Sequence, residues 1–531
     1  MQNLKEYYQR YPLQSILWMA LAIRLLAAFF SKGYGFHDDH FDVIRVAQNW
    51  LYGLPHWLES PLPPKHSMPY AAVNAGFMWV AQALGLHDPI HKTTFLRIIH
   101  AFYSLLTIYY AYRITEQIST VKSAIKVGWV LCVLWFMPFM SVRFMAEMVC
   151  IPPILAGFYF ILKSGADTRN SLKNALIAGV LFGISFTFRM HVVLFAGALG
   201  IVLLFEKRWK ESLFIILGFV FCITLTIGLP DYWYFEYPFQ YIVYYFTYNG
   251  ANAYNYITSS PFKFLLTTFG FLVPPVSLML MMGYIKSRKI APHLFWAVLL
   301  FFIVHSTFPN KQERFILPMF PFLIIMGVAG WSYFRESSSF WQRKQRLERG
   351  CWNFFWWANV IAALALALTY SKKDRVAPIH YLSGKPELTS LIVESGTNKL
   401  KQVPVYYLGR MAADYNDFEK GDVLGMNDFK VNKRHLKDSF PFVFTLRADQ
   451  EVSELRDQMQ SVNKVPNYVI FKGRENLEGR MAKVNELFPS QKLILEREIE
   501  PSLFDKLLRV LNPRRHRDKV ALIYRLIDEK H

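Results

Sequence analysis

Long apolar segments separated by short polar turns dominate the first two thirds of the chain. A helix of about 20 apolar residues is long enough to cross the roughly 30 Å hydrocarbon layer of a membrane. The pattern predicts membrane-spanning helices over residues 13–31, 92–115, 121–141, 143–163, 172–188, 190–206, 210–229, 262–286, 291–308, 314–334 and 351–371. We therefore expect a mostly α, polytopic membrane domain over residues 1–371.

The polar turns divide into basic ones and others, and this division predicts an orientation. The Lys/Arg-rich turns are residues 113–126, 163–173, 206–211, 285–289 and 335–349. Short basic loops tend to stay in the cytoplasm. All five fall on one side if residues 68–86 form a surface helix and do not cross. About eleven crossings then place the N-terminus in the cytoplasm, and the first outer loop (32–91) and the C-terminal tail outside.

After residue 371 the apolar runs shorten to the length of strands. These runs cover residues 403–409, 442–446, 468–471, 493–496 and 520–526, and a helical pattern covers 475–488. Short apolar runs that alternate with helical patterns predict a small soluble α/β domain over residues 372–531. The domain has no Gly-rich phosphate loop, and its role stays open between acceptor contact and structure.

Composition agrees with a membrane protein. The 531 residues are 53% hydrophobic and 18% charged, and the mean hydropathy is +0.19. The net charge of +20 is explained by the basic cytoplasmic loops, so we expect no nucleic-acid partner. The four cysteines all lie within apolar runs, which argues against a disulfide framework and against a zinc site.

Ionisable residues outside the basic turns collect on the predicted outer face. They are Asp39, Arg143, Glu147, Arg189, His191, Asp231, Lys311, Glu313 and Arg314. A single charge at the membrane boundary often only extends its side chain to water. Acids and bases that come from six separate loops favour a catalytic cavity at the outer surface.

The segment GYGFHDDHFD, residues 33–42, is the densest of these groups. The apolar spacing from Phe41 onward predicts an amphipathic helix on the surface. Asp39 near the membrane could accept a proton from an incoming hydroxyl, as a general base does. Two alternatives stay open, namely a helix N-cap built from the same acids and a His/Asp metal site.

Basic residues at other outer turns suggest contacts with an anion. Lys311 and Arg314 bracket a membrane entry in NKQERF (310–315) and suit a lipid-linked phosphate, although an ordinary turn with basic flanks is the alternative. Arg189 lies at the turn FRMH (188–191). Arg143 and Glu147 are spaced i, i+4, which predicts a pair on one helix face.

Two further patterns have a structural and a functional interpretation. Arg24 and Arg97 lie within predicted spans, where an arginine is costly and usually partnered, so each is expected to face the cavity. The aromatic stretch 229–262 fits the belt that anchors helices at the membrane interface, or a groove on which sugar rings stack.

The order of these motifs resembles the polyprenyl-phosphate-mannose-dependent α-mannosyltransferases of GT-C architecture, which include the GPI-anchor and lipid-linked-oligosaccharide enzymes. That family carries His-Pro-Asp-Glu after its first helix, and HDDH (37–40) occupies this place. Asp39 matches the catalytic aspartate, whereas Asp38 replaces the proline and His40 replaces the glutamate. The late His-Lys-Glu-x-Arg-Phe motif resembles NKQERF, with Asn310 and Gln312 departing.

Three weaker matches follow the same order. The turn at Arg189 resembles an Arg-Pro-Thr-like element, LPDYWYFEYP nominates Asp231, and residues 91–114 resemble the second spanning helix with Arg97 in place. The resemblance covers roughly residues 10–335.

The resemblance implies transfer of mannose from polyprenyl-phosphate mannose to a hydroxyl of a glycan or lipid-linked acceptor, with inversion. It implies that Asp39 is the base and that Lys311, Arg314 and Arg189 hold the donor phosphate. Residues expected to position substrates are His37, His40, Arg143, Glu147, Asp231 and Arg97. A lipid phosphate leaving group needs no nucleotide-sugar metal, so we expect no essential metal or other cofactor.

Other functions stay open beside this one. The nearest is another GT-C reaction, such as aminoarabinose transfer or glycan polymerisation. A flippase or transporter of lipid-linked glycans would carry inverted repeats, which the sequence does not show. A membrane scaffold that presents the C-terminal domain is the third. The chain has no Asn-x-Ser/Thr sequon, which favours a bacterial inner membrane with a periplasmic site over an endoplasmic-reticulum membrane with a lumenal one.

Overall fold

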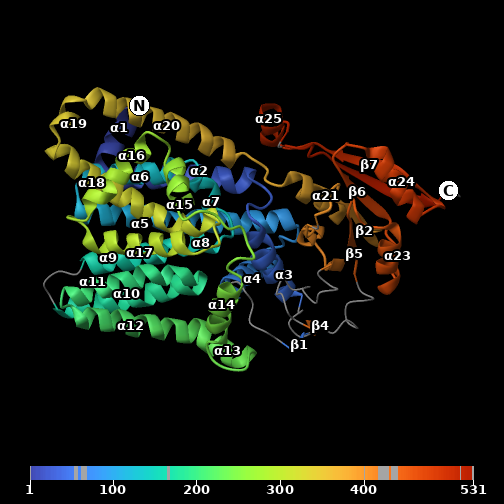
Figure 1. Cartoon of the computed structure of the whole chain (residues 1–531), viewed down its shortest axis with the longest axis horizontal. Coiled ribbons are helices and arrows are strands. Elements are labelled where there is room, and N and C mark those ends of the chain that lie inside the picture. Colours follow the sequence, from blue (N-terminus) through green and yellow to red (C-terminus); the bar gives the residue numbers. More distant parts are fainter. Residues whose placement is uncertain are drawn as a thin grey trace. The chain divides into compact units, whose positions relative to one another are not determined.

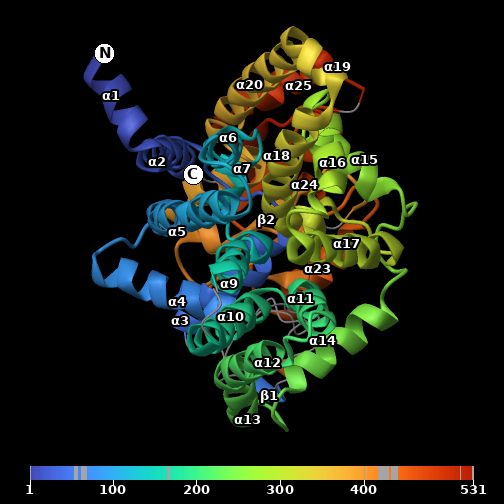
Figure 2. The same ribbon diagram turned by 90° about the vertical axis from the view of Figure 1, so that its left-hand side faces the viewer.

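The computed structural model describes residues 2–52, 58–60, 68–163, 168–399, 401–416, 430–431, 440–514 and 516–528. The chain forms two compact units, which Figures 1 and 2 show from two sides. We call Met1–Phe29, Lys65–Tyr70 and Arg97–Leu368 the helical unit. We call Phe30–Pro64, Ala71–Leu96 and Thr369–His531 the loop–tail unit, because it joins the first polar loop to the C-terminal tail.

The helical unit is built from apolar helices joined by short turns. Its main helices are α2 (Pro12–Phe30), α5 (Pro89–Ile118, which it shares), α6 (Val121–Val133), α7 (Met137–Ser141), α8 (Ala146–Val149), α9 (Ile151–Lys163), α10 (Thr168–Phe188), α11 (Val193–Phe205), α12 (Trp209–Ile223), α13 (Leu229–Tyr234), α14 (Gln240–Ala251), α15 (Lys263–Phe271), α16 (Val276–Ser287), α17 (Pro292–Thr307), α18 (Phe320–Ser337) and α20 (Gln345–Ala367).

Six helices of the described residues are long and apolar enough to cross a membrane, and the chain is an integral membrane protein. They are Pro12–Phe30, Ala146–Lys163, Arg169–Phe188, Trp209–Tyr234, Glu313–Ser337 and Gln345–Ala367. The pair α15 and α16, bent by 115°, makes a seventh if it is one span. The predicted number of eleven is therefore not shown. One reason is that predicted spans are broken, as residues 121–141 are into α6 and α7.

Glycines allow α16 and α18 to pack with their backbones in contact. A Cβ atom added to Gly283 would lie 1.9 Å from the carbonyl oxygen of Gly327. One added to Gly330 would lie 2.0 Å from the carbonyl oxygen of Gly283. No side chain fits at such distances, so small residues set the spacing of this helix pair, as they often do in membranes.

The loop–tail unit contains a six-stranded mixed sheet in the order β3-β5-β2-β6-β8-β7. Strands β2 (Ser390–Glu394), β5 (Phe442–Leu446) and β6 (Tyr468–Lys472) are parallel, with β3 (Ala413–Asp414) beside β5. Strand β8 (Ala521–Asp528) runs antiparallel between β6 and β7 (Gln491–Ile499). Its helices are α21 (Lys373–Ser383), α23 (Val452–Ser461), α24 (Leu477–Leu487) and α25 (Leu503–Leu511).

The first loop contributes a π-helix, η1 (Asp39–Arg45), which continues into α3 (Val46–Leu51), and strand β1 (Leu58–Ser60), which pairs with β4 (Lys430–Val431). Helix α4 (Met68–Ala83) follows. The helices predicted from Phe41 onward and at 68–86 are therefore confirmed, although their position on a membrane surface stays a prediction.

Four of the five predicted strands are confirmed, and one is wrong. Residues 403–409 contain no strand and instead include a 3₁₀ helix, η6 (Val405–Leu408). Pro404, which has no N–H for a strand ladder, precedes it, and Gly409 with φ +70° ends it. The helix predicted at 475–488 is present as α24, whereas the buried strand β2 was not predicted.

We expect Gly283→Ala to lower the free energy of unfolding by about 1–3 kcal/mol, because the new methyl group must push α16 and α18 apart. Thermal unfolding of the purified protein in detergent measures the change. Gly197→Ala in α11 is the matched control, because nothing lies within 4 Å of a Cβ atom there. An equal shift of the unfolding temperature in both variants would contradict the close approach.

Candidate active site

One carboxylate in the helical unit holds two arginines. Glu147 lies on the short helix α8, and its Oε1 is 3.2 Å from Nη2 of Arg189 and 3.7 Å from Nε of Arg314. Arg189 precedes the 3₁₀ helix η3 (Met190–Val192) with an extended backbone, and Arg314 lies in the 3₁₀ helix η5 (Glu313–Met319). All three side chains are largely buried. The ends of three helical segments thus supply one charged cluster.

An aromatic ring fixes the same two arginines from another side. The guanidinium carbons of Arg189 and Arg314 each lie 5.4 Å from the centroid of the Phe315 ring. Such cation–π contacts are worth most where water is excluded. Nε of Arg314 also donates a hydrogen bond of 2.9 Å to Oε1 of Gln312. Glu147, Arg189 and Arg314 together carry one negative and two positive charges, so the group has net affinity for an anion.

Two histidines lie beside this cluster. The ring centroids of His191 and His305 are 4.9 Å apart, and that of His191 is 6.1 Å from Phe315. His305 Nδ1 is 2.8 Å from the carbonyl oxygen of Phe301, one turn earlier in α17. The sequence placed His191 on the outer face without assigning it a role, and the structure brings it next to the arginine pair.

Lys311, predicted to hold phosphate, has backbone partners in this structure. Its Nζ donates to the carbonyl oxygens of His305 and Ser306, at 3.0 and 2.8 Å, and to that of Phe308. A lysine ammonium has three donors, so these contacts cap the C-terminal end of α17. The structure therefore gives Lys311 a structural role, and its role in phosphate binding stays a prediction.

Other predicted site residues of the helical unit have partners or positions of their own. Oδ2 of Asp231 accepts a hydrogen bond of 2.9 Å from the backbone N–H of Tyr241, which satisfies a free donor at the start of α14. Arg97 is fully buried on α5, and Arg143 lies with its guanidinium carbon 4.3 Å from the Phe139 ring centroid.

One expectation about arginines needs correction, and another stays a prediction. Arg143 lies before α8, in non-helical residues, so the helical i, i+4 geometry assumed for Arg143 and Glu147 is wrong. Arg24 donates hydrogen bonds to Ser104 Oγ and to the carbonyl oxygens of Leu131 and Ala20. Its guanidinium is thus partnered, as expected of an arginine within a span, and its position facing the cavity stays a prediction.

In the loop–tail unit, Asp39 is buried at the first position of η1. Its Oδ2 accepts a hydrogen bond of 2.9 Å from the backbone N–H of Gly35. This contact closes the loop before the π-helix and fixes the direction of the carboxylate. Asp39 therefore has a local structural role, but this contact is not a helix N-cap, because the Gly35 N–H lies before the π-helix and Asp38 at the cap position makes no side-chain cap hydrogen bond. The role leaves the chemistry of Asp39 open.

His40 is packed between two tyrosines. Its ring stacks on Tyr34 with centroids 4.8 Å apart and on Tyr407 at 5.1 Å. Burial lowers the pKa of His40 well below its ordinary value, and the nearby Arg45 lowers it further. The imidazole is therefore neutral at physiological pH. His37, also predicted to position substrate, stacks on Phe41 with centroids 4.4 Å apart.

Neither Tyr34 nor Tyr407 was predicted from the sequence to lie beside a site residue. Tyr407 was expected to lie in a strand, and its contact with His40 joins segments far apart in the chain. As for a metal, the described ranges contain no group of three His, Cys, Asp or Glu side chains placed to hold one.

We expect Glu147→Gln to lower the free energy of unfolding by about 3 kcal/mol, because it leaves two buried guanidiniums without their shared negative charge. Denaturant or thermal unfolding in detergent measures this loss. Glu313→Gln is the control, since its ion pair with Lys263 is half-exposed and is worth at most about 1 kcal/mol. Equal stability of the two variants would show that Glu147 does not hold the cluster.

Comparisons with known proteins give a consistent result for the fold. ArnT from Cupriavidus metallidurans bound to undecaprenyl phosphate is similar with a TM-score of 0.57 and 12% identity, over 96% of this chain and 97% of that one. The oligosaccharyltransferase of Archaeoglobus fulgidus is similar with a TM-score of 0.53 and 12% identity, over 86% and 68% of the two chains. These likenesses agree with the expected GT-C architecture.

A second structure of the Archaeoglobus fulgidus protein, AglB with an inhibitory peptide and a dolichol-phosphate, has a TM-score of 0.50 and 11% identity, over 88% of this chain and 70% of that one. The search of curated proteins found no match. The family model described as the Alg9-like mannosyltransferase family matches residues 15–407, which include both the arginine cluster and Asp39. The chain therefore belongs to the Alg9-like mannosyltransferase family and is a glycosyltransferase of the membrane.

Proposed function

We propose that this protein transfers mannose from polyprenyl-phosphate mannose to a hydroxyl of a glycan or lipid-linked acceptor, with inversion at the anomeric carbon. In this single displacement the acceptor oxygen bonds to the anomeric carbon while the bond from that carbon to the phosphate oxygen breaks. The phosphate leaves with the electron pair, and the acceptor proton passes to a base. No oxidant, metal or nucleotide is needed for the balance.

The observation that carries the proposal is the arginine pair held by Glu147 in a family of mannosyltransferases. Negative charge grows on the phosphate as the sugar leaves, and guanidiniums fixed in advance stabilise that charge without reorganising. The planar donor fork of arginine suits phosphate oxygens. ArnT and AglB have been solved with polyprenyl phosphates, which supports a lipid phosphate as the leaving group.

Asp39 is the proposed base. A carboxylate whose second oxygen is held by the Gly35 N–H has a defined direction, which proton transfer from a hydroxyl requires. The neighbouring His40 takes the place of a family glutamate, but it is neutral and packed between rings. It therefore supplies no second carboxylate, and the proposal gives the proton to Asp39 alone.

Seven further residues are proposed to bind the substrates. Lys311 would act with Arg189 and Arg314 at the phosphate, and His37, His40, Arg143, Glu147, Asp231 and Arg97 would position the substrates. We further propose a domain boundary near residue 371 and a C-terminal domain on the outer face. The reaction would then take place on the periplasmic side of a bacterial inner membrane. An endoplasmic-reticulum membrane with a lumenal reaction is the alternative.

A different sugar on the same lipid carrier is the second candidate. The arginine pair would bind the phosphate whichever sugar it carries, and the fold is shared with ArnT. Parallel assays with mannose, glucose and aminoarabinose donors on polyprenyl phosphate separate the two. Transfer from a donor other than mannose, with none from polyprenyl-phosphate mannose, would favour this candidate. Movement of a lipid-linked glycan without bond change would favour a flippase.

Asp39→Asn should reduce transfer by a factor of about 10²–10⁴, because the amide no longer accepts the proton. The amide oxygen still accepts the Gly35 N–H, so the loop should keep its shape. The assay follows labelled mannose from polyprenyl-phosphate mannose to lipid-linked glycans with purified protein.

Asp42→Asn is the matched control, since Asp42 lies in the same π-helix and has no assigned chemistry. We expect it to keep near-normal transfer. Full activity of Asp39→Asn, with the protein folded by size-exclusion chromatography, would remove Asp39 from the mechanism.

A further inference from the structure

Helix α25 presents an apolar face that no other part of its unit covers. Leu503, Leu507, Val510 and Leu511 are 87%, 53%, 80% and 70% exposed. Their spacing of i, i+4, i+7 and i+8 places them on one side of the helix. Figure 1 shows α25 standing apart from the sheet on the chain that leaves β7.

The other helices that follow sheet strands in this unit behave differently. Helix α23 buries Leu455 and Met459, and α24 buries Val484 and Leu487. Helix α25 has no buried residue. Its exposed leucines are therefore not a general property of this domain, and their exposure to water carries a cost that a partner would remove.

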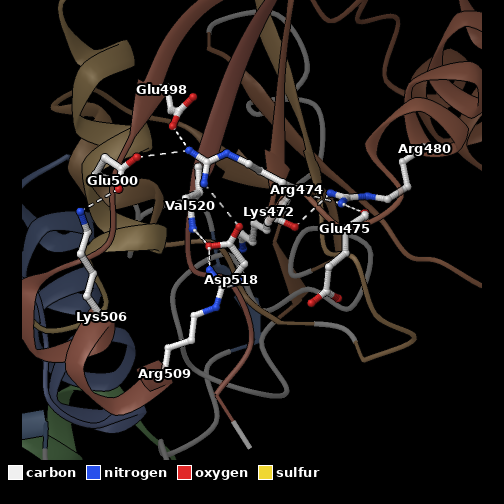
Figure 3. A network of polar contacts seen from close by, with 11 residues as sticks. Lys472, Arg474, Glu475, Arg480, Glu498, Glu500, Lys506, Arg509, Asp518 and Val520 are labelled. Atoms are coloured by element: carbon white, nitrogen blue, oxygen red, sulfur yellow. Dashed lines mark hydrogen bonds and ion pairs between the residues drawn. The ribbon is translucent and has the colours of Figure 1, made fainter. Parts of the chain in front are cut away.

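Ion pairs hold the opposite face of α25 toward its own domain. Nζ of Lys506 lies 2.9 Å from Oε2 of Glu500, and Nη1 of Arg509 lies 2.9 Å from Oδ1 of Asp518. Nζ of Lys519 lies 2.6 Å from Oδ1 of Asp505. Figure 3 shows Lys506 and Arg509 reaching from the helix to these acids. The helix is thereby oriented with its apolar face directed away.

A pocket of about 480 Å³ is lined among others by Arg474, Glu500 and Lys506, and it reaches Val510 at the edge of the apolar face and Arg517 beyond the helix. Most of its charged groups are paired, as Arg474 is with Glu498 and Glu500. The pocket therefore belongs to the support of α25, and the unsatisfied surface is the apolar one.

Basic side chains adjoin the apolar face in sequence. Arg514 and Arg517 follow the helix directly and are exposed. The structure records no ion pair between either one and another described residue. An apolar helix face flanked by unpaired arginines is the pattern of helices that lie in the interface of an anionic membrane.

We propose that α25 is an interfacial anchor, which inserts Leu503, Leu507, Val510 and Leu511 among the lipids of the bilayer that its own chain spans, while Arg514 and Arg517 contact anionic headgroups. A bilayer is always close to this chain, because the chain is integral to a membrane. Charge complementarity favours anionic lipid as the occupant of the face. The inference needs only membrane integration and is independent of the proposed mannosyl transfer.

The test places an environment-sensitive fluorophore on α25 of the full chain in lipid nanodiscs. Cys351 is changed to serine, because it is the one native cysteine that is not buried, and Leu507→Cys then carries the label. The nanodiscs contain phosphatidylcholine, with or without phosphatidylglycerol, and lipids with brominated acyl chains serve as quenchers. Ala482→Cys, exposed on α24, is the matched control, and Val510→Cys is a second probe of the face.

We expect a blue shift and bromine quenching at positions 507 and 510, water-like emission at 482, and stronger quenching when phosphatidylglycerol is present. The pair Arg514→Glu and Arg517→Glu should abolish the gain from phosphatidylglycerol. Water-like emission at 507 and 510 would overturn the proposal. A blue shift without bromine quenching would overturn it as well, because protein and not lipid would then cover the face. An undiminished gain in the charge-reversed variant would overturn the role of the arginines.

Discussion

The two buried arginines of the candidate site depend on one shared carboxylate, that of Glu147. Charges buried in a bundle that lies in lipid are costly unless each has a partner of opposite sign. Oε1 of Glu147 supplies this partner to Arg189 and Arg314 together, and the ring of Phe315 adds a contact with both guanidiniums. The two arginines can then stay charged and in place, with one positive charge in excess, where we propose that the lipid phosphate binds.

This cluster exists because helices are interrupted at the right places. Glu147 lies on a four-residue helix that follows non-helical residues, Arg189 takes an extended backbone between α10 and η3, and Arg314 lies in a 3₁₀ segment before α18. In an uninterrupted α-helix the direction of each side chain is set by its position in the helix, because every residue adds the same rotation. The irregular backbone at these helix ends therefore sets the positions of the three charged side chains. Breaks in helices also explain why some predicted spans are shorter than expected.

The sequence predicted much of the secondary structure and the identity of the charged residues, but few of their contacts. Hydrophobic periodicity located α2, α10 and α20, and short apolar runs located β5, β6 and β8. The periodicity of apolar residues does not predict which side chains contact one another. The sequence therefore assigned Glu147 to Arg143 by spacing alone. The hydrophobic pattern also predicted a strand at Tyr407. It missed the effect of Pro404 and Gly409, which restrict the backbone without changing that pattern. The resemblance to mannosyltransferases came from the order of motifs, and the family match over residues 15–407 confirms it.

The central claim is that Arg189 and Arg314, held by Glu147, receive the phosphate of the lipid donor. An experimental structure of the protein with a bound polyprenyl phosphate tests this most directly. The account predicts that phosphate oxygens accept hydrogen bonds from the guanidiniums of Arg189 and Arg314 while Glu147 keeps its place between them. A phosphate bound elsewhere, with no contact to either arginine, would contradict it.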